Sequence, residues 1–257
     1  TYISKKAKVL LTPYIVFGLI YWLIFIVMEG FSVEPLIHLF TINTTGLPIA
    51  GALWFLTSLF FTDVIYFLLD RWNTKWLIFL FVVVGSFVDQ ILPYSLPWAL
   101  SASFVGLGLY WLGEWSREHE DRIKPTLNMN KWQVMSVGII TVGLIFVNDT
   151  INMREGKYAI IPLFWVNALL SVYLGISISK QICRIIKCQW LMSIGKNSIV
   201  YVCLNQVVII LMKKILNTFL LPTAALKLLT FALSMLILYI MSLFLTRTQF
   251  KVILGKD

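Results

Sequence analysis

Apolar stretches as long as a lipid bilayer is thick recur along this chain, and no other feature limits its fold as strongly. A hydrocarbon core of about 30 Å needs about 20 residues of helix to cross it. Backbone groups in lipid must bond within their own segment, so each stretch is expected to be helical. We predict an all-α, polytopic integral membrane helix bundle of about eight transmembrane helices, at residues 9–28, 53–69, 76–92, 98–113, 132–148, 160–179, 198–216 and 225–246.

The composition excludes an ordinary soluble domain. Of the 257 residues, 59% are hydrophobic and 13% are charged, against about 45–50% and about 25% in a typical soluble domain. The net charge is +9, but the basic residues stand in short segments between the apolar stretches. That distribution favours a role in membrane orientation over nucleic-acid binding. We expect a lipid bilayer and no nucleic acid among the partners, and a single domain over residues 1–257.

The distribution of Lys and Arg also predicts the orientation. When alternate segments between the stretches are counted, sixteen of the 21 Lys and Arg residues fall on one side and five on the other. Segments rich in Lys and Arg stay in the cytoplasm, so both ends of this chain are predicted to be cytoplasmic. Residues 29–52 and 149–159 then face the outside. The three cysteines form no C-x-x-C pattern, and neither a disulfide nor a bound metal is expected.

The second stretch carries polar groups that lipid alone would not tolerate. Ser58, Thr62 and Tyr66 recur at i, i+4 and i+8 and so share one helix face, with Asp63 beside it. A carboxylate inside a membrane is costly unless it faces protein or water. These residues, with Trp54 at the outer interface, are predicted to line a cavity. Packing of Ser58 and Thr62 against neighbouring helices is the alternative.

The residues alone assign no catalytic group. His38 lies in an outer segment and Asp63 lies near mid-span, and both are weak candidates for a general base. The other histidine, His119, stands among charged residues in a segment expected to be a solvated loop. Neither histidine has a carboxylate and a nucleophile at a defined spacing, so no catalytic triad can be built from the sequence.

Two polar segments adjoin the predicted spans. Residues 193–198, "SIGKNS", lack a glycine that a phosphate-binding loop requires, and we expect a turn there. Its Lys196 could still contact an anionic ligand. Residues 151–159, "INMREGKYA", place Asn152 and Tyr158 in an outer segment of mixed charge.

Five segments, taken in order, resemble those of a known family. They are "KKAKVLLTPYIVFGLIYWL", "GALWFLTSLFF", "LPWALSASFVGLGLYWLGE", "INMREGKYA" and "WLMSIGKNSIVYVCLNQVVIILMKKIL". Together they are similar to the bacterial membrane acyltransferase 3 family, especially its fucose 4-O-acetylase-like branch. Their order and spacing carry more weight than any single motif, because apolar helices resemble one another. The similarity covers nearly the whole chain.

The resemblance implies a membrane-bound O-acyltransferase, multi-pass in the bacterial cytoplasmic membrane. Such an enzyme takes an acetyl or other short acyl group from acetyl-CoA or another acyl-CoA. It places that group on a hydroxyl of a cell-envelope or exported polysaccharide, without a metal. By their position in the matching segments, three lysines would attract the CoA phosphates: Lys5, Lys8 and Lys196. Six residues would bind substrate: Trp54, Ser58, Asp63, Tyr66, Asn152 and Tyr158.

The chain departs from the family pattern at its beginning. The family's first two helices carry an Arg and an essential His, and the His would act as general base on the sugar hydroxyl. We expect these helices to precede Thr1 in the parent protein, and this chain to be inactive alone. The competing function is a transporter or exporter of polysaccharide or small solutes, with Asp63 as a proton-coupled or substrate-binding carboxylate. A purely structural membrane subunit is the third alternative.

Overall fold

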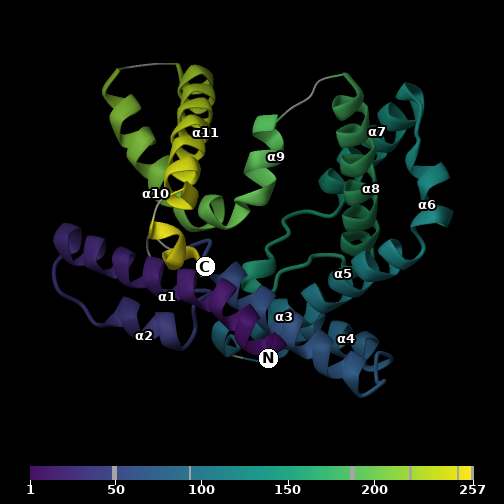
Figure 1. The fold of residues 1–257 in the computed structure, drawn as a ribbon, viewed down its shortest axis with the longest axis horizontal. Coiled ribbons are helices and arrows are strands. Elements are labelled where there is room, and N and C mark those ends of the chain that lie inside the picture. The colour runs from purple at the N-terminus through teal and green to yellow at the C-terminus, as the bar shows by residue number, and fades with distance from the viewer. Residues whose placement is uncertain (48–50, 93, 186–188, 220–221, 248, 256–257) are drawn as a thin grey trace. The chain divides into compact units, whose positions relative to one another are not determined.

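The structure is a computed structural model that describes residues 1–47, 51–92, 94–185, 189–219, 222–247 and 249–255 (Figure 1). These residues form helices without any strand, apart from an isolated bridge between Asn152 and Lys157. The α-helices are α1 (Tyr2–Glu29), α2 (Glu34–Phe40), α3 (Trp54–Arg71), α4 (Leu77–Ile91), α5 (Leu100–Glu118), α6 (Glu120–Leu127), α7 (Lys131–Val147), α8 (Ile161–Ile185), α9 (Gln189–Lys196), α10 (Ser198–Leu216) and α11 (Thr223–Arg247). The 3-10 turns are η1 (Pro97–Ala99), η2 (Met153–Glu155), η3 (Asn217–Phe219) and η4 (Gln249–Leu254). The predicted all-α class is confirmed.

Four helices among the described residues are long and apolar enough to cross a membrane: α1, α8, α10 extended by η3, and α11. The apolar helices α4 and α7 have 15 and 17 residues, which rise only about 22–26 Å against a core of about 30 Å. Helix α3 carries Asp63, Asp70 and Arg71. The predicted count of about eight spans is therefore not confirmed, while four such helices fit a multi-pass membrane protein.

Three segments that the sequence predicted as loops or turns are helical. Lys5, Lys6 and Lys8 lie on the first turns of α1 rather than before it. The charged segment that contains His119 continues α5 and then forms α6, and the "SIGK" letters end α9. Charged side chains can reach water from the surface of a helix as well as from a loop. A high density of charge therefore did not show whether these segments are helices or loops.

The chain divides into two compact units, each with its own buried cluster. The first unit is made of Thr1–Val64, Leu96–Leu100 and Trp190–Asp257. The second is made of Ile65–Ser95 and Ser101–Gln189, so the boundary falls within α3. The single domain predicted for residues 1–257 stays a prediction.

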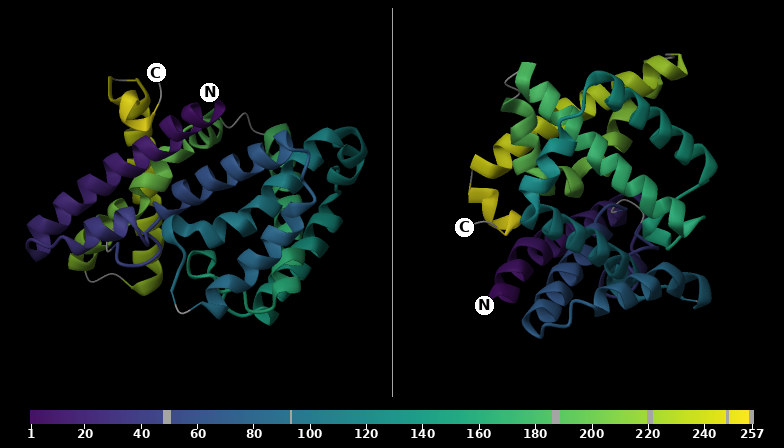
Figure 2. Two further views of the ribbon diagram at one scale, coloured as in Figure 1. Left: turned by 90° about the horizontal axis from the view of Figure 1, so that it is seen from below. Right: turned by 90° about the vertical axis from the view of Figure 1, so that its right-hand side faces the viewer.

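One face of α1 forms the core of the first unit. Leu10, Tyr14, Phe17 and Tyr21 recur every three or four residues, as on a packed helix face, and all are buried. Buried side chains from or beside α2, α3, α10 and α11 complete this core: Leu39, Leu53, Leu56, Val200, Cys203, Leu204, Val208 and Leu238. Helices α10 and α11 pack side by side as an antiparallel pair (Figure 1 and Figure 2).

Glycine and a capping box shape the second unit. A Cβ at Gly85 would lie 2.6 Å from Phe104 Cβ and 2.9 Å from the carbonyl oxygen of Ser101, so a larger residue would force α4 away from α5. Asn130 caps the start of helix α7: its side chain accepts a hydrogen bond from the Gln133 backbone amide, and the Gln133 side chain accepts one from the Asn130 backbone amide. Helix α8 packs against α7.

Candidate functional site

Asp63 is buried in an ion pair. Its side chain on α3 is 3% exposed, and its Oδ2 lies 2.9 Å from Nζ of Lys6 on α1. The hydroxyl of Tyr2 donates to the other carboxylate oxygen at 3.4 Å, and the Lys6 ammonium lies 5.4 Å from the Tyr2 ring centroid. An unpaired buried carboxylate would be costly. We call these three residues the Asp63 cluster. The ion pair with Lys6 offsets the cost of burying the Asp63 carboxylate.

The sequence prediction of the site missed Lys6, although a signal for it was present. Tyr2 and Lys6 precede Leu10 at intervals of four residues, and Leu10 begins the buried face of α1. Once α1 is extended back to Tyr2, the same helix face carries both side chains toward the core. The Lys6 side chain remains 34% exposed, so its ammonium bridges the buried carboxylate and the surroundings.

The boundary between the two units divides the polar line predicted on α3, and the cavity that it was predicted to line stays a prediction. Ser58 and Thr62 are buried in the first unit, each with bonded or contacting neighbours. Trp54 stands at the start of α3 with its ring edge-on to Phe55, 6.1 Å between centroids. Tyr66 belongs to the second unit, where its ring packs 4.8 Å from that of Tyr110. The structure therefore places Ser58, Thr62 and Asp63 in one unit and Tyr66 in the other.

A second buried polar network in the first unit escaped the sequence analysis. The Asn43 amide nitrogen donates to the Tyr14 hydroxyl at 3.1 Å and to Thr57 Oγ1 at 2.8 Å. Tyr14 in turn donates to the Leu39 carbonyl, and Thr57 donates to the Trp54 carbonyl. The network joins α1, α3 and the segment after α2, because its members come from all three. Asn43 is fully buried.

Asn152 and Tyr158 support the turn between α7 and α8. Asn152 accepts a hydrogen bond from the Arg154 amide at 3.1 Å, and its own backbone pairs with that of Lys157. Tyr158 is 1% exposed and packs 5.0 Å from the Phe164 ring. Burial raises the pKa of Tyr158, and the negative charge of Asp89 raises it further. Tyr158 is buried and Asn152 is half-buried, and their predicted contact with an acceptor stays a prediction.

The three lysines predicted to attract CoA phosphates all belong to the first unit and are exposed. Lys5 and Lys8 extend from the first turns of α1, and Lys196 ends α9. The described contacts do not bring the three together, and their role in holding acyl-CoA stays a prediction.

The described contacts of the two histidines are with residues of their own segments. The Nδ1 atom of His38 lies 3.1 Å from the Ile42 carbonyl oxygen, and its Nε2 lies 3.8 Å from Glu34. His119 bonds the Trp115 carbonyl through Nδ1 and stacks on the Trp115 ring. In the described part of the chain, no three His, Cys, Asp or Glu side chains gather as metal ligands would.

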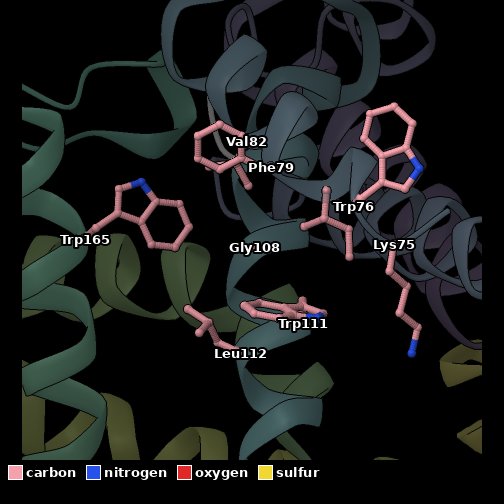
Figure 3. Close-up of a pocket in the computed structure, with 9 residues that line it drawn as sticks. Lys75, Trp76, Phe79, Val82, Gly108, Trp111, Leu112 and Trp165 are labelled. Atoms are coloured by element: carbon pink, nitrogen blue, oxygen red, sulfur yellow. The ribbon is translucent and has the colours of Figure 1, made fainter.

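A pocket of about 430 Å³ opens in the second unit (Figure 3). Its lining is almost wholly apolar, with Lys75 as the charged member: Lys75, Trp76, Ile78, Phe79, Val82, Gly108, Trp111, Leu112 and Trp165. We call it the tryptophan pocket. A Cβ at Gly108 would lie 2.7 Å from Val82 and from Trp165, so glycine keeps this wall open. Such a lining suits an acyl or alkyl chain.

The charge of Lys75 is already balanced at the tryptophan pocket. Its ammonium lies 2.9 Å from Asp70 and 3.4 Å from Glu114. It also lies 5.3 Å from the centroid of the Tyr66 ring. Two carboxylates beside one ammonium make this corner unattractive to an anion.

The family comparison matches nearly the whole chain. A family model described as an acyltransferase domain matches residues 1–246, which cover the second compact unit and most of the first. No curated protein and no solved structure matches the chain.

Proposed function

Because this chain belongs to the acyltransferase 3 family, we propose that it is a membrane-bound O-acyltransferase acting on a cell-envelope or exported polysaccharide. The donor is acetyl-CoA or another short acyl-CoA, and the acceptor is a sugar hydroxyl. The observation that carries the proposal is the family match over residues 1–246, which leaves only the last 11 of the 257 residues outside it.

The reaction converts a thioester into an ester. The sugar hydroxyl oxygen attacks the thioester carbonyl carbon, a C–O bond forms, and the C–S bond breaks. The hydroxyl proton passes to a general base, and CoA leaves as its thiolate, which then takes up a proton. Acyl-CoA carries several phosphate charges, so the exposed ammonium groups of Lys5, Lys8 and Lys196 are proposed to hold it electrostatically.

The membrane arrangement is part of the same proposal. Eight spans with both ends of the chain in the cytoplasm would place Lys5, Lys8 and Lys196 on the side that holds acyl-CoA. The four helices long and apolar enough to cross a membrane support the multi-pass part of this arrangement. Asn152 and Tyr158 would then lie in the outer segment, where a polysaccharide is found.

Transport of polysaccharide or small solutes is the competing function, and the Asp63 cluster argues against its simplest form. A carboxylate that couples transport to protons must be able to gain and lose a proton during the cycle. Both oxygens of the Asp63 carboxylate are already engaged, one by the Lys6 ammonium at 2.9 Å and the other by the Tyr2 hydroxyl at 3.4 Å. The pair of Lys6 and Asp63 fits a fixed link between α1 and α3 that supports an enzyme site.

Membranes from cells that express the complete reading frame provide the test. They would be incubated with acetyl-CoA and the host polysaccharide, with release of free CoA thiol and the O-acetyl proton signal of the glycan as readouts. Both should rise together. If acyl-CoA is not consumed and the glycan gains no acyl group, the acyl-transfer proposal fails and transport becomes the better account.

Variants of the lysines separate donor binding from chemistry. The K5Q/K8Q double variant should raise KM for acyl-CoA several-fold and leave kcat nearly unchanged, because the lost interaction acts on the bound donor rather than on the reacting atoms. K251Q is the matched control, since Lys251 in η4 is also exposed and predicted to be cytoplasmic. An equal effect of K251Q would mean that general positive charge, rather than a site, attracts the donor.

A further inference from the structure

A groove between α10 and α11 has unsatisfied polar groups along its wall. It measures about 600 Å³ and is lined by Tyr201, Asn205, Ile209, Lys213, Thr223, Leu226, Lys227, Thr230, Phe231, Ser234, Met235 and Leu238. We call it the hairpin groove. All of its lining residues belong to the first unit. None of them has a role in the proposed acyl transfer.

Three side chains of the hairpin groove hold buried polar atoms that lack a hydrogen-bond partner among the described residues: Tyr201 Oη, Asn205 Oδ1 and Ser234 Oγ. Ser234 is 3% exposed. Buried polar groups are paired in the great majority of cases, and an unpaired one costs about 1–3 kcal/mol. Three along one groove, two on α10 and one on α11, therefore indicate a ligand with hydroxyl groups. Asn205 Oδ1 can only accept, so that ligand must offer a donor.

Two lysines stand at the end of the same groove. Lys213 is near the end of α10 and Lys227 is near the start of α11, so the antiparallel packing of the two helices brings them to one end. Neither ammonium has a carboxylate within ion-pair distance in the part of the chain that the structure describes. Between Glu155 and Asp257 the sequence contains no acidic residue at all. This segment therefore supplies no carboxylate to balance the two lysines.

The spacing of these groups fits a charged head next to a hydroxylated group. Asn205 is eight residues before Lys213, and Ser234 is seven residues after Lys227. At a rise of about 1.5 Å per residue, Asn205 and Ser234 lie about 10–12 Å along their helices from Lys213 and Lys227, and Tyr201 lies about 18 Å from Lys213. Lysine side chains span several ångströms of that distance. Ile209, Leu226 and Phe231 supply apolar surface between the two ends.

We propose that the hairpin groove binds an amphiphile whose phosphate is flanked by hydroxyl groups. Lys213 and Lys227 hold the phosphate, and Asn205 accepts a hydrogen bond from a ligand hydroxyl. Ser234 binds a further oxygen atom of the headgroup, while the acyl chains extend from the groove into the surrounding bilayer. Two sources share this chemistry: a membrane lipid such as phosphatidylglycerol, and a lipid-linked sugar phosphate. The site is independent of acyl-CoA.

The test is lipid retention by the full chain, measured by native mass spectrometry after purification in detergent. Three lipids with identical acyl chains are offered in equal amounts: phosphatidylglycerol, phosphatidylmethanol and phosphatidylcholine. Phosphatidylmethanol has the phosphate charge but no headgroup hydroxyl, and phosphatidylcholine has neither net charge nor hydroxyl. Phosphatidylglycerol should be retained about tenfold over phosphatidylcholine and several-fold over phosphatidylmethanol.

Separate variants remove the two kinds of recognition. K213Q/K227Q should bring retention of phosphatidylglycerol close to that of phosphatidylcholine. N205L should keep the preference over phosphatidylcholine but lose the preference over phosphatidylmethanol. K214Q is the matched control, because Lys214 is the next residue on α10 and does not line the groove. Before the comparison, each variant must elute from a size-exclusion column and show helical circular dichroism in the same way as the unmodified chain.

The outcomes decide the proposal without reference to catalysis. Equal retention of phosphatidylglycerol and phosphatidylcholine by the unmodified chain overturns it, as does a loss in K214Q as large as that in K213Q/K227Q. Millimolar glucose 1-phosphate distinguishes the two sources. Displacement of phosphatidylglycerol identifies a sugar phosphate as the occupant, and undiminished retention identifies a membrane lipid.

Discussion

Removal of Lys6 should destabilise the protein more than removal of Asp63, its partner in the ion pair. Two unit charges 2.9 Å apart attract by about 1.5 kcal/mol in water and by about 6 kcal/mol at an effective dielectric constant near 20. Lys6 is 34% exposed and Asp63 is 3% exposed, so solvent screening places the effect toward the lower end. We expect K6M to cost about 1–3 kcal/mol, because it leaves the carboxylate buried and unpaired.

The two single variants are not equivalent, because only one of the charges can reach water. In D63N the Lys6 ammonium is released toward solvent, and the asparagine still accepts a hydrogen bond from Tyr2. We expect D63N to cost about 1 kcal/mol or less. The K6M/D63N double variant should cost less than the sum of the two, because once the charge of Asp63 is gone the loss of Lys6 removes no attraction.

Unfolding by SDS in mixed micelles, followed through tryptophan fluorescence, measures these differences in the free energy of unfolding. The four chains of the cycle would be compared at one pH and one lipid-to-detergent ratio. The reasoning is refuted if K6M costs no more than D63N, or if the two single effects simply add. Either result would mean that the 2.9 Å contact is not an energetic link between α1 and α3.

Three further predictions concern other parts of the chain. G108A should cost about 1–3 kcal/mol and narrow the tryptophan pocket, since the added Cβ would lie 2.7 Å from two side chains; SDS unfolding measures the cost. Y14F should cost about 1–3 kcal/mol because it breaks the buried network, whereas Y158F should be neutral or stabilising because that hydroxyl has no partner among the described residues. The pKa of Glu155 is lowered by its hydrogen bond from Lys157. The contribution of this pair to folding stability is therefore complete above the unfolded-state pKa of Glu155, and it is lost as the pH falls through the folded-state pKa. Carboxyl NMR titration should show the Glu155 pKa rising toward its ordinary value in K157Q.

Each of these predictions has its own control. Gly113 has no atom within 4 Å of an added Cβ, so G113A should leave the pocket unchanged, and an equal cost in G113A would contradict the steric argument. An equal loss in Y14F and Y158F would show that ring packing, not hydroxyl bonding, is being measured. A Glu155 titration that does not move in K157Q would rule out Lys157 as the cause of the shift.

The fold class and the polar character of α3 could be predicted from the sequence, because bilayer-length apolar runs and i, i+4 spacing are local properties. The extent of the helices could not be predicted where charges are dense. Helix α6 was predicted as a loop, yet its i, i+4 pair of Glu120 and Lys124 lies at 3.3 Å, an arrangement that stabilises a helix. Charge density does not distinguish a solvated helix from a solvated loop.

The partners within the candidate site were the least predictable feature. Asp63 was recognised as a buried carboxylate, but its partner lies 57 residues away on α1. Only the packing of α1 on α3 joins the two. The same holds for Tyr14 and Asn43, which are 29 residues apart. Of the predicted substrate residues, Tyr66 lies in a different unit from Ser58 and Asp63, because one continuous helix can contribute to two cores.

The burial of Asn43 has a practical consequence for anyone producing this protein. Asn43-Thr44-Thr45 is an acceptor sequence for N-linked glycans, and residues 29–52 are predicted to face the lumen in a eukaryotic secretory host. Oligosaccharyltransferase acts on the emerging chain, before Asn43 can donate to Tyr14 and Thr57. A glycan attached there would occupy the space of the buried network. Yeast or insect expression should therefore yield a glycosylated fraction that cannot close its core, and a bacterial host avoids that loss.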